Sequence, residues 1–335
     1  RGWGRWRDAL GPDYSVARQG MVRGAGLISL MAFWSLAAQA PGLWGARGLS
    51  PAGVLEPWLL PAMGAGGLAG VMMLLGVLPW WTTLTALGLW IFALQLPGNW
   101  LRLPGDRLLA EFGVVLLFLS RPRDRRLPEI GAGSVPPVGI FLANVLLFRV
   151  LLGSGLSKLL ESDPFWLRET ALHVFFETQP LPSVPAWYLH HLPATFLKYG
   201  VWAVMMVELM LPFYFFLPRL FRALAAGGTA LLMLGVIAIG NHGPAPWVVL
   251  LLAAGLVDDR FLRERLPARW APPVSPAAAR KSVGWVTLGV LFFWVPLNVL
   301  ALRPLQPAAW LPPWAGMGDS LQRLGLLHHA RFGSP

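Results

Sequence analysis

The chain has 335 residues, of which 56% are hydrophobic and only 13% are charged, and it contains no cysteine. An average soluble domain carries about 25% charged residues, so this composition excludes an ordinary soluble protein. The net charge of +11 would favour a nucleic-acid partner in a soluble protein. Here the basic residues stand in short clusters between apolar windows, as orientation signals do in membrane proteins. We therefore expect an all-α, polytopic helical membrane protein and no nucleic-acid partner.

Apolar windows of about the length that crosses a bilayer follow one another along most of the chain. They are 24–40, 62–78, 80–96, 108–120, 138–157, 199–217, 223–240, 245–257 and 282–301. The sequence therefore predicts about nine transmembrane helices, with a re-entrant or interfacial loop between the fifth and the sixth.

The basic residues between these windows predict the orientation of the chain. Seventeen Lys and Arg residues fall on one side of the membrane and nine on the other. Because cytoplasmic loops carry the basic excess, the N-terminus is expected inside and the C-terminus outside. The predicted division is a cytoplasmic flank at 1–23, a transmembrane domain at 24–301 with an outer loop at 158–198, and an outer tail at 302–335.

Ionisable side chains inside the windows need a partner, since each costs at least about 2.5 kcal/mol in hydrocarbon. Glu111 lies in the fourth window, Arg149 in the fifth and Glu208 in the sixth. In the predicted topology Arg149 and Glu208 lie at similar depths below the outer surface. We therefore predict that Arg149 and Glu208 form a buried ion pair.

The same topology gathers polar side chains at the outer face. They are Asp106, Glu111, Lys158, Glu177, His190, His191, Asn241 and His242. This grouping of polar side chains predicts that the protein acts on the periplasmic or luminal side of the membrane. No metal site is expected, because adjacent histidines on a regular helix cannot both turn to one ion and no zinc-ligand spacing is present. No catalytic residue or cofactor is assigned on these grounds.

The outer loop is too rich in aromatic residues for a solvated loop of its length. Its prolines restrict the backbone and leave room for two short amphipathic helices, near 164–176 and 184–191. We expect residues 158–193 to fold back onto the outer ends of the helices as a partly buried, rigid element. In that arrangement Glu177, Gln179, His190 and His191 lie beside Lys158.

Several runs in this part of the chain resemble one family of membrane proteins. The runs are FRVLLGSGLSKL (148–159), DPFWLRETALHVFFETQPLPSVPAWYLHHLP (163–193), VELMLPFYFFLPR (207–219), GNHG (240–243) and VDD (257–259). Together with 26–51 and 105–113 they are similar to the lipase maturation factor family over roughly residues 20–260. The segment ETQPLP…WYLHHLP is the most specific of these matches.

The resemblance implies a multi-pass, non-catalytic maturation factor that assists the folding or assembly of a secreted lipase or another exported protein. Its client-facing surface is expected on the periplasmic or luminal side, with membrane lipids as its other partners. The family positions carried over are Asp106, Glu111, Arg149, Gly155, Lys158, Glu177, Thr178, Gln179, Pro180, Trp187, Tyr188, His190, His191, Asn241 and Gly243. The expected membrane is the bacterial cytoplasmic membrane, or that of the endoplasmic reticulum if the source is eukaryotic.

Two features depart from the family pattern. Gly105 stands where the family has Trp before Asp106, and the C-terminal extramembrane domain of the family is expected to be absent or truncated. Two other functions stay open. The segment GLSKL (155–159) is distantly similar to a segment of the vitamin K-dependent carboxylases, and this likeness would make Lys158 a catalytic base. A structural subunit of a membrane complex is the other alternative.

Overall fold

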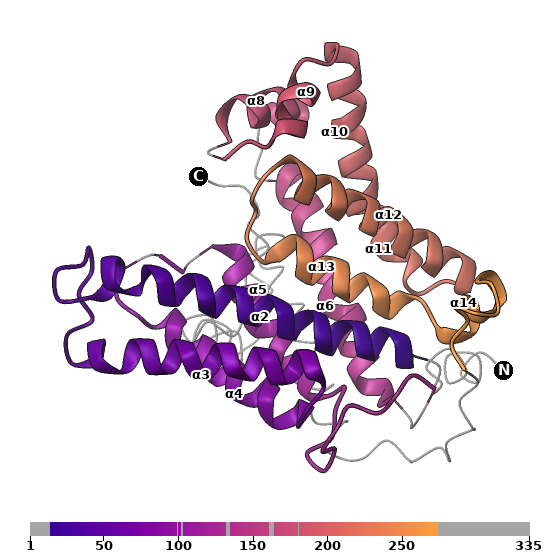
Figure 1. Ribbon diagram of the computed structural model, residues 1–335. Helices are drawn as coiled ribbons and strands as arrows, with labels where there is room; N and C mark the ends of the chain where they lie inside the picture. Colours follow the sequence, from indigo (N-terminus) through magenta and orange to yellow (C-terminus); the bar gives the residue numbers. More distant parts are fainter. Residues whose placement is uncertain are drawn as a thin grey trace, which may run out of the picture.

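The computed structural model describes residues 14–98, 100–101, 103–131, 135–160, 164–179 and 181–273. This part of the chain is all-α, as predicted (Figure 1). Its helices are α2 (Ser15–Trp44), η1 (Gly53–Leu55), α3 (Glu56–Leu75), α4 (Pro79–Leu94), α5 (Pro104–Leu117), α6 (Pro137–Leu160), α7 (Pro164–Leu167), α8 (Ala171–Thr178), α9 (Val184–His190), α10 (Ala194–Leu209), α11 (Leu211–Tyr214), α12 (Arg219–Ile239), α13 (Ala245–Ala253), η2 (Ala254–Leu256) and α14 (Asp259–Arg265). The β-structure within it is limited to two isolated bridges, Val77 with Arg126 and Pro182 with Gly240.

Each predicted window up to residue 257 contains a helix, but the predicted number of nine spans is not confirmed. Among the described residues, five helical segments are long and apolar enough to cross a membrane: Ser15–Trp44, Gly53–Leu75, Pro137–Leu160, Ala194–Tyr214 and Arg219–Ile239. The apolar helices at Pro79–Leu94 and Ala245–Leu256 are shorter. The window 282–301 and the tail 302–335 lie outside the described residues.

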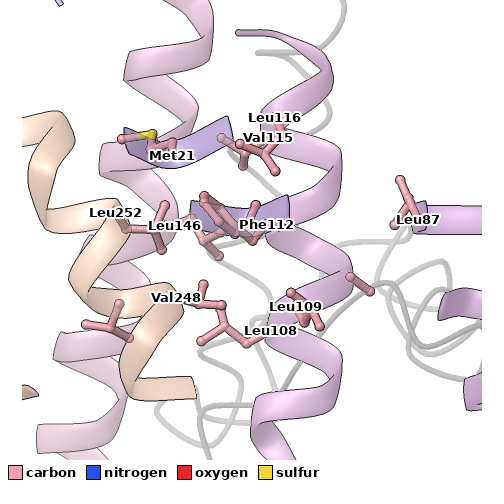
Figure 2. Packing of buried hydrophobic residues seen from close by; sticks show 14 of the residues in the cluster. Met21, Leu87, Leu108, Leu109, Phe112, Val115, Leu116, Leu146, Val248 and Leu252 are labelled. Carbon is pink, nitrogen blue, oxygen red and sulfur yellow. The ribbon is translucent and has the colours of Figure 1, made fainter. Parts of the chain in front are cut away.

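Helix α5 lies at the centre of the hydrophobic core. Its residues Leu108, Phe112 and Val115 are completely buried. Figure 2 shows them beside Leu146 of α6 and Val248 of α13. Because neighbours surround α5, its polar residues face protein and not lipid, which makes its charged side chains tolerable.

Helices α2 and α3 pack with their backbones in contact. A Cβ atom added to Gly26 would lie 2.5 Å from the backbone nitrogen of Leu74, and one added to Gly70 would lie 2.7 Å from that of Leu30. Only glycine fits at such distances, as is common where membrane helices associate. The Gly-rich second window therefore contributes to close packing of α2 and α3.

Residues far apart in sequence meet at one end of the bundle, which we call the arginine end. It comprises the start of α2, the turn at 76–78, the segment 121–131, the start of α12 and the segment 257–259. Leu127 N–H donates to Gly76 O at 2.8 Å, and Gly131 N–H donates to Ser15 Oγ at 2.8 Å. This end contains the densest basic clusters of the described chain.

Two buried aspartates hold the arginine end together. Asp258 accepts a hydrogen bond from Arg222 at 3.1 Å and forms an ion pair with Arg219 at 3.0 Å, and Arg222 also donates to the Tyr14 hydroxyl at 2.6 Å. The neighbouring Asp259 accepts Ser15 N–H at 2.8 Å and the Ser15 hydroxyl at 2.6 Å. It thereby satisfies backbone donors at the N-terminus of α2, where an anion is also favoured by the helix dipole.

The opposite end of the bundle, the loop end, comprises the end of α6, helices α7–α9, the start of α10 and the segment 239–245. In Figure 1, α8 and α9 lie beside α10, away from α14. The starts of α5 and α13 also meet here, since a Cβ on Gly105 would lie 3.1 Å from Ala245 N. The helices thus alternate in direction along the chain, which is the arrangement that the predicted topology requires.

Candidate functional site

The buried ion pair of Arg149 differs from the predicted one. Arg149 on α6 pairs with Glu111 on α5, and the two side chains are 3% and 0% exposed. The prediction that Arg149 pairs with Glu208 is therefore wrong. Depth along the membrane normal was the only criterion available from sequence, and it does not report which helix α6 faces at that level.

Glu208 pairs instead with Lys158, in the last turn of α6. Ser154 completes this group, because its hydroxyl donates to Glu208 Oε1 at 3.1 Å and accepts from Lys158 Nζ at 2.8 Å. Gly155 lets α10 approach, since a Cβ there would lie 3.0 Å from Glu208 Cβ and 2.8 Å from Leu209 Cδ2. The small residue thus brings the carboxylate within reach of the ammonium.

The surroundings of Lys158 favour a structural ion pair over a catalytic base. Its three N–H donors face three acceptors: Glu208 Oε2, Ser154 Oγ and Ser154 O, the last at 3.3 Å. The ring of Trp166 from α7 covers the ammonium at 4.9 Å. A general base needs a lone pair directed at the proton it removes, and these contacts leave no such direction open.

Helix α9 confirms the predicted helix near 184–191, whereas the segment predicted as one helix near 164–176 is divided into α7 and α8. Helices α8 and α9 dock on the end of α12. The Ser183 hydroxyl donates to Ala238 O at 2.6 Å, and Ser183 N–H donates to Ile239 O at 3.3 Å. Gln179 Nε2 donates to Ile239 O at 3.3 Å. These bonds satisfy carbonyl groups that the helix end leaves without partners.

An aromatic contact joins the loop to the turn after α12. Phe175 of α8 stacks on His242 with ring centroids 5.7 Å apart. Burial lowers the pKa of His242 and so favours the neutral imidazole. A Cβ on Gly240 would lie 3.0 Å from Gln179 Oε1 and 3.2 Å from His242 Nε2, so the glycine allows both side chains to approach the turn.

The docked loop exposes a group of four large apolar side chains. Leu181, Val184, Trp187 and Tyr188 are 64%, 72%, 59% and 65% exposed. The indole of Trp187 contacts the rings of Tyr188 and His191 at centroid distances of 5.1 and 4.2 Å. We call these four exposed residues the loop surface. It offers rigid aromatic side chains, which bind a partner with little loss of conformational entropy.

Asp106 lies in the first turn of α5, ahead of the predicted membrane window 108–120. Its carboxylate accepts the Leu103 N–H at 3.2 Å and caps the helix. Burial raises the pKa of this carboxyl group from 3.8 to about 6, against the lowering effect of the Leu103 hydrogen bond. At neutral pH a buried carboxylate with a raised pKa lowers the stability of the folded chain. Such perturbed pKa values are typical of functional positions.

The remaining predicted residues are spread over the loop end. Glu177, Thr178 and Asn241 are exposed, and the Thr178 hydroxyl donates to Val174 O in its own helix. His190 packs against His191 at a centroid distance of 5.3 Å. That Glu177, Gln179, His190 and His191 lie beside Lys158 stays a prediction. In the described part of the chain, no three His, Asp or Glu side chains are grouped to hold a metal ion.

Sequence reasoning missed several residues that build these contacts. Ser154 lies four residues before Lys158, so the spacing of neighbours on a helix face was the signal for it. Nothing in the sequence singles out Trp166 or Ser183 among many similar loop residues. Tyr14, Asp258 and Asp259 form the hydrogen bonds that hold the arginine end together. Of these three, only the two aspartates belong to a run that resembles the family, VDD at 257–259.

Comparisons with known proteins agree with this architecture. Residues 55–264 match the family model of the lipase maturation factor transmembrane domain. The chain is 32% identical to lipase maturation factor 2 of Rattus norvegicus over 76% of this chain and 43% of that protein. It is 32% identical to lipase maturation factor 2 of Homo sapiens over 74% of this chain and 40% of the relative. The chain thus spans less than half the length of these curated relatives. No solved structure matches it significantly.

Proposed function

Because the chain belongs to the lipase maturation factor family, we propose that it assists the folding or assembly of a secreted lipase or a similar exported protein. It acts as an integral membrane protein whose working side is the loop end, on the periplasmic or luminal face. The relatives' name supports the class of client, and the basic excess of the opposite end supports the orientation.

The loop surface is the observation that carries this proposal. It combines four large, exposed apolar side chains with a backbone fastened to α12 by the bonds of Ser183 and Gln179. A folding client exposes apolar segments that a fixed aromatic surface can cover. Glu177, Thr178, His190, His191 and Asn241 would supply polar contacts around it.

A pull-down with the purified full chain tests the proposal. Periplasmic or luminal extract is passed over the immobilised protein, and the eluate is assayed for lipase activity and identified by mass spectrometry. We expect enrichment of a secreted lipase. A Trp187→Ala, Tyr188→Ala variant should lose most of this enrichment, because it removes the two aromatic side chains of the loop surface. The variant should still fold, since both side chains are more than half exposed.

The matched control changes the same two residue types on α10. Tyr199 and Trp202 are 64% and 54% exposed, and the Tyr199→Ala, Trp202→Ala variant should retain the lipase. Equal loss in both variants, or no enrichment of any lipase by the unaltered chain, contradicts the proposal. A quinone-like lipid retained with the purified protein would favour the enzyme alternative instead.

A further inference from the structure

A group of exposed arginines at the arginine end has no role in the proposed function. Arg121, Arg123, Arg125 and Arg126 follow α5 in the run RPRDRR, which we call the basic turn. Its backbone is fixed to the turn between α3 and α4, since Leu78 N–H donates to Arg125 O at 2.9 Å. An antiparallel bridge joins Val77 and Arg126. The arginines are therefore presented by an anchored backbone.

A cation from a distant part of the sequence joins the basic turn. Nη2 of Arg23, an exposed residue of α2, lies 3.8 Å from the position of a Cβ on Gly76. Leu127 N, at the end of the basic turn, lies 3.8 Å from the same position. Asp124, the acid within the turn, accepts the Arg121 N–H at 3.1 Å. The concentration of positive charge here thus exceeds what the run alone supplies and favours an anionic ligand.

Two tryptophans place these arginines at the level of the lipid headgroups. Trp81 Nε1 donates to Pro122 O at 3.0 Å, which ties the first turn of α4 to the basic turn. Trp80 and Trp81 pack edge to face at 4.8 Å, and Trp81 is 51% exposed. Tryptophan gathers at the membrane–water interface. Arginines carried on the anchored backbone beside it would lie near phospholipid phosphates, and their planar donor pairs match phosphate oxygens.

We propose that the basic turn, together with Arg23 and the Trp80–Trp81 pair, binds the phosphate headgroup of an anionic phospholipid in the leaflet on that side of the membrane. The guanidinium groups bind the phosphate and the indole of Trp81 contacts the upper acyl chain. The site is separate from the loop surface, because the basic turn lies at the opposite end of the bundle.

Lipid binding to the purified full chain in detergent tests this site. Phosphatidylglycerol, phosphatidylcholine and inorganic phosphate are each titrated, with retained lipid counted by native mass spectrometry and the thermal unfolding midpoint recorded. We expect phosphatidylglycerol to be retained and to raise the midpoint, and the other two to do neither. An Arg123→Gln, Arg125→Gln, Arg126→Gln variant should bind phosphatidylglycerol about fivefold more weakly for each arginine removed.

The control removes the same charge from the same end. In the Arg260→Gln, Arg265→Gln, Arg269→Gln variant the changed residues lie on or just after α14, and binding of phosphatidylglycerol should be unchanged. Equal weakening in both variants would show diffuse attraction and overturn the site. Equal effects of inorganic phosphate or phosphatidylcholine would overturn it as well. If the triple variant does not fold, Arg23→Gln compared with Arg260→Gln decides by the same criterion.

Discussion

The arginine end and the docked helices α8 and α9 are held to the bundle by different kinds of contact. At the arginine end, Asp258 and Asp259 are 3% and 1% exposed and bind side chains and backbone from two distant segments, the start of α2 and the start of α12. At the loop end, α8 and α9 dock through neutral groups, chiefly the Ser183 hydroxyl, the Gln179 amide and the stack of Phe175 on His242. Charge-assisted hydrogen bonds are roughly twice as strong as neutral ones.

This difference suggests that the arginine end stabilises the bundle and that the docked loop binds a partner. Segments that bind partners are commonly drawn from the less stable parts of a protein. The arginine end closes the bundle, whereas the loop end can open locally without disturbing the core. We therefore expect substitutions of charged groups to lower global stability and substitutions in the docked loop to act locally.

The largest effect should come from the buried pair between the two ends. Arg149→Met strands the Glu111 carboxylate and should cost about 3–5 kcal/mol of unfolding free energy. The Arg149→Met, Glu111→Met double variant should recover much of that loss, as measured by thermal unfolding in detergent. Recovery by Glu208→Met in place of Glu111→Met would contradict the observed pairing.

At the arginine end, Asp258→Ala should lower the unfolding free energy by about 3 kcal/mol, because it leaves the buried Arg222 guanidinium without its carboxylate. Glu264→Ala is the matched control, since Glu264 pairs with Arg260 on the surface of α14. Such exposed pairs contribute about 0.2–1 kcal/mol. Similar midpoints for the two variants would contradict a larger stabilising contribution of the buried Asp258.

Gly155→Ala tests the close approach that places Glu208 beside Lys158. The added methyl group would lie 2.8 Å from Leu209 Cδ2, and overpacking of this kind costs about 1–3 kcal/mol. Gly227→Ala in α12 is the control, because a Cβ there meets nothing within 4 Å. It should leave stability unchanged or slightly higher. A Gly155→Ala variant as stable as the control would refute the tight contact.

Asp106→Asn should make stability less dependent on pH. Well below pH 3.8 the carboxyl group is protonated in the folded and the unfolded chain, so parent and variant should be similarly stable. Between about pH 4 and pH 6 the unfolded chain is ionised while the folded chain still holds its proton, so the parent loses stability across this window and levels off above it. The parent should then fall about 1–2 kcal/mol below the variant. Parallel unfolding curves from pH 4 to pH 8 would contradict the raised pKa.

The smallest effect should come from Ser183→Ala at the loop end. It removes the bond to Ala238 O and the N-cap of α9, at a cost of about 1 kcal/mol. Faster amide hydrogen exchange should be confined to residues around α9. Thr178→Val, which removes a bond within α8, is the control and should not loosen α9. Loss of protection throughout the bundle would contradict a local role.

Composition and periodicity determined the all-α membrane class, the eight helical regions up to residue 257 and the short helices of the outer loop. These features follow from local physics, because apolar length specifies a membrane helix and proline specifies where a helix begins. The family was also recognisable from runs such as ETQPLP…WYLHHLP, which lie within the matched residues 55–264.

Only the tertiary structure decided which side chains meet. Sequence placed Arg149 and Glu208 at similar depths, yet the rotation of α6 directs Arg149 to Glu111 and Lys158 to Glu208. Rotation depends on close contacts such as that of Gly155 with Leu209, which no single segment encodes. The same holds for Asp259, which caps a helix that begins 244 residues earlier in the chain. Depth and helicity are properties of one segment, whereas partner choice is a property of how segments pack.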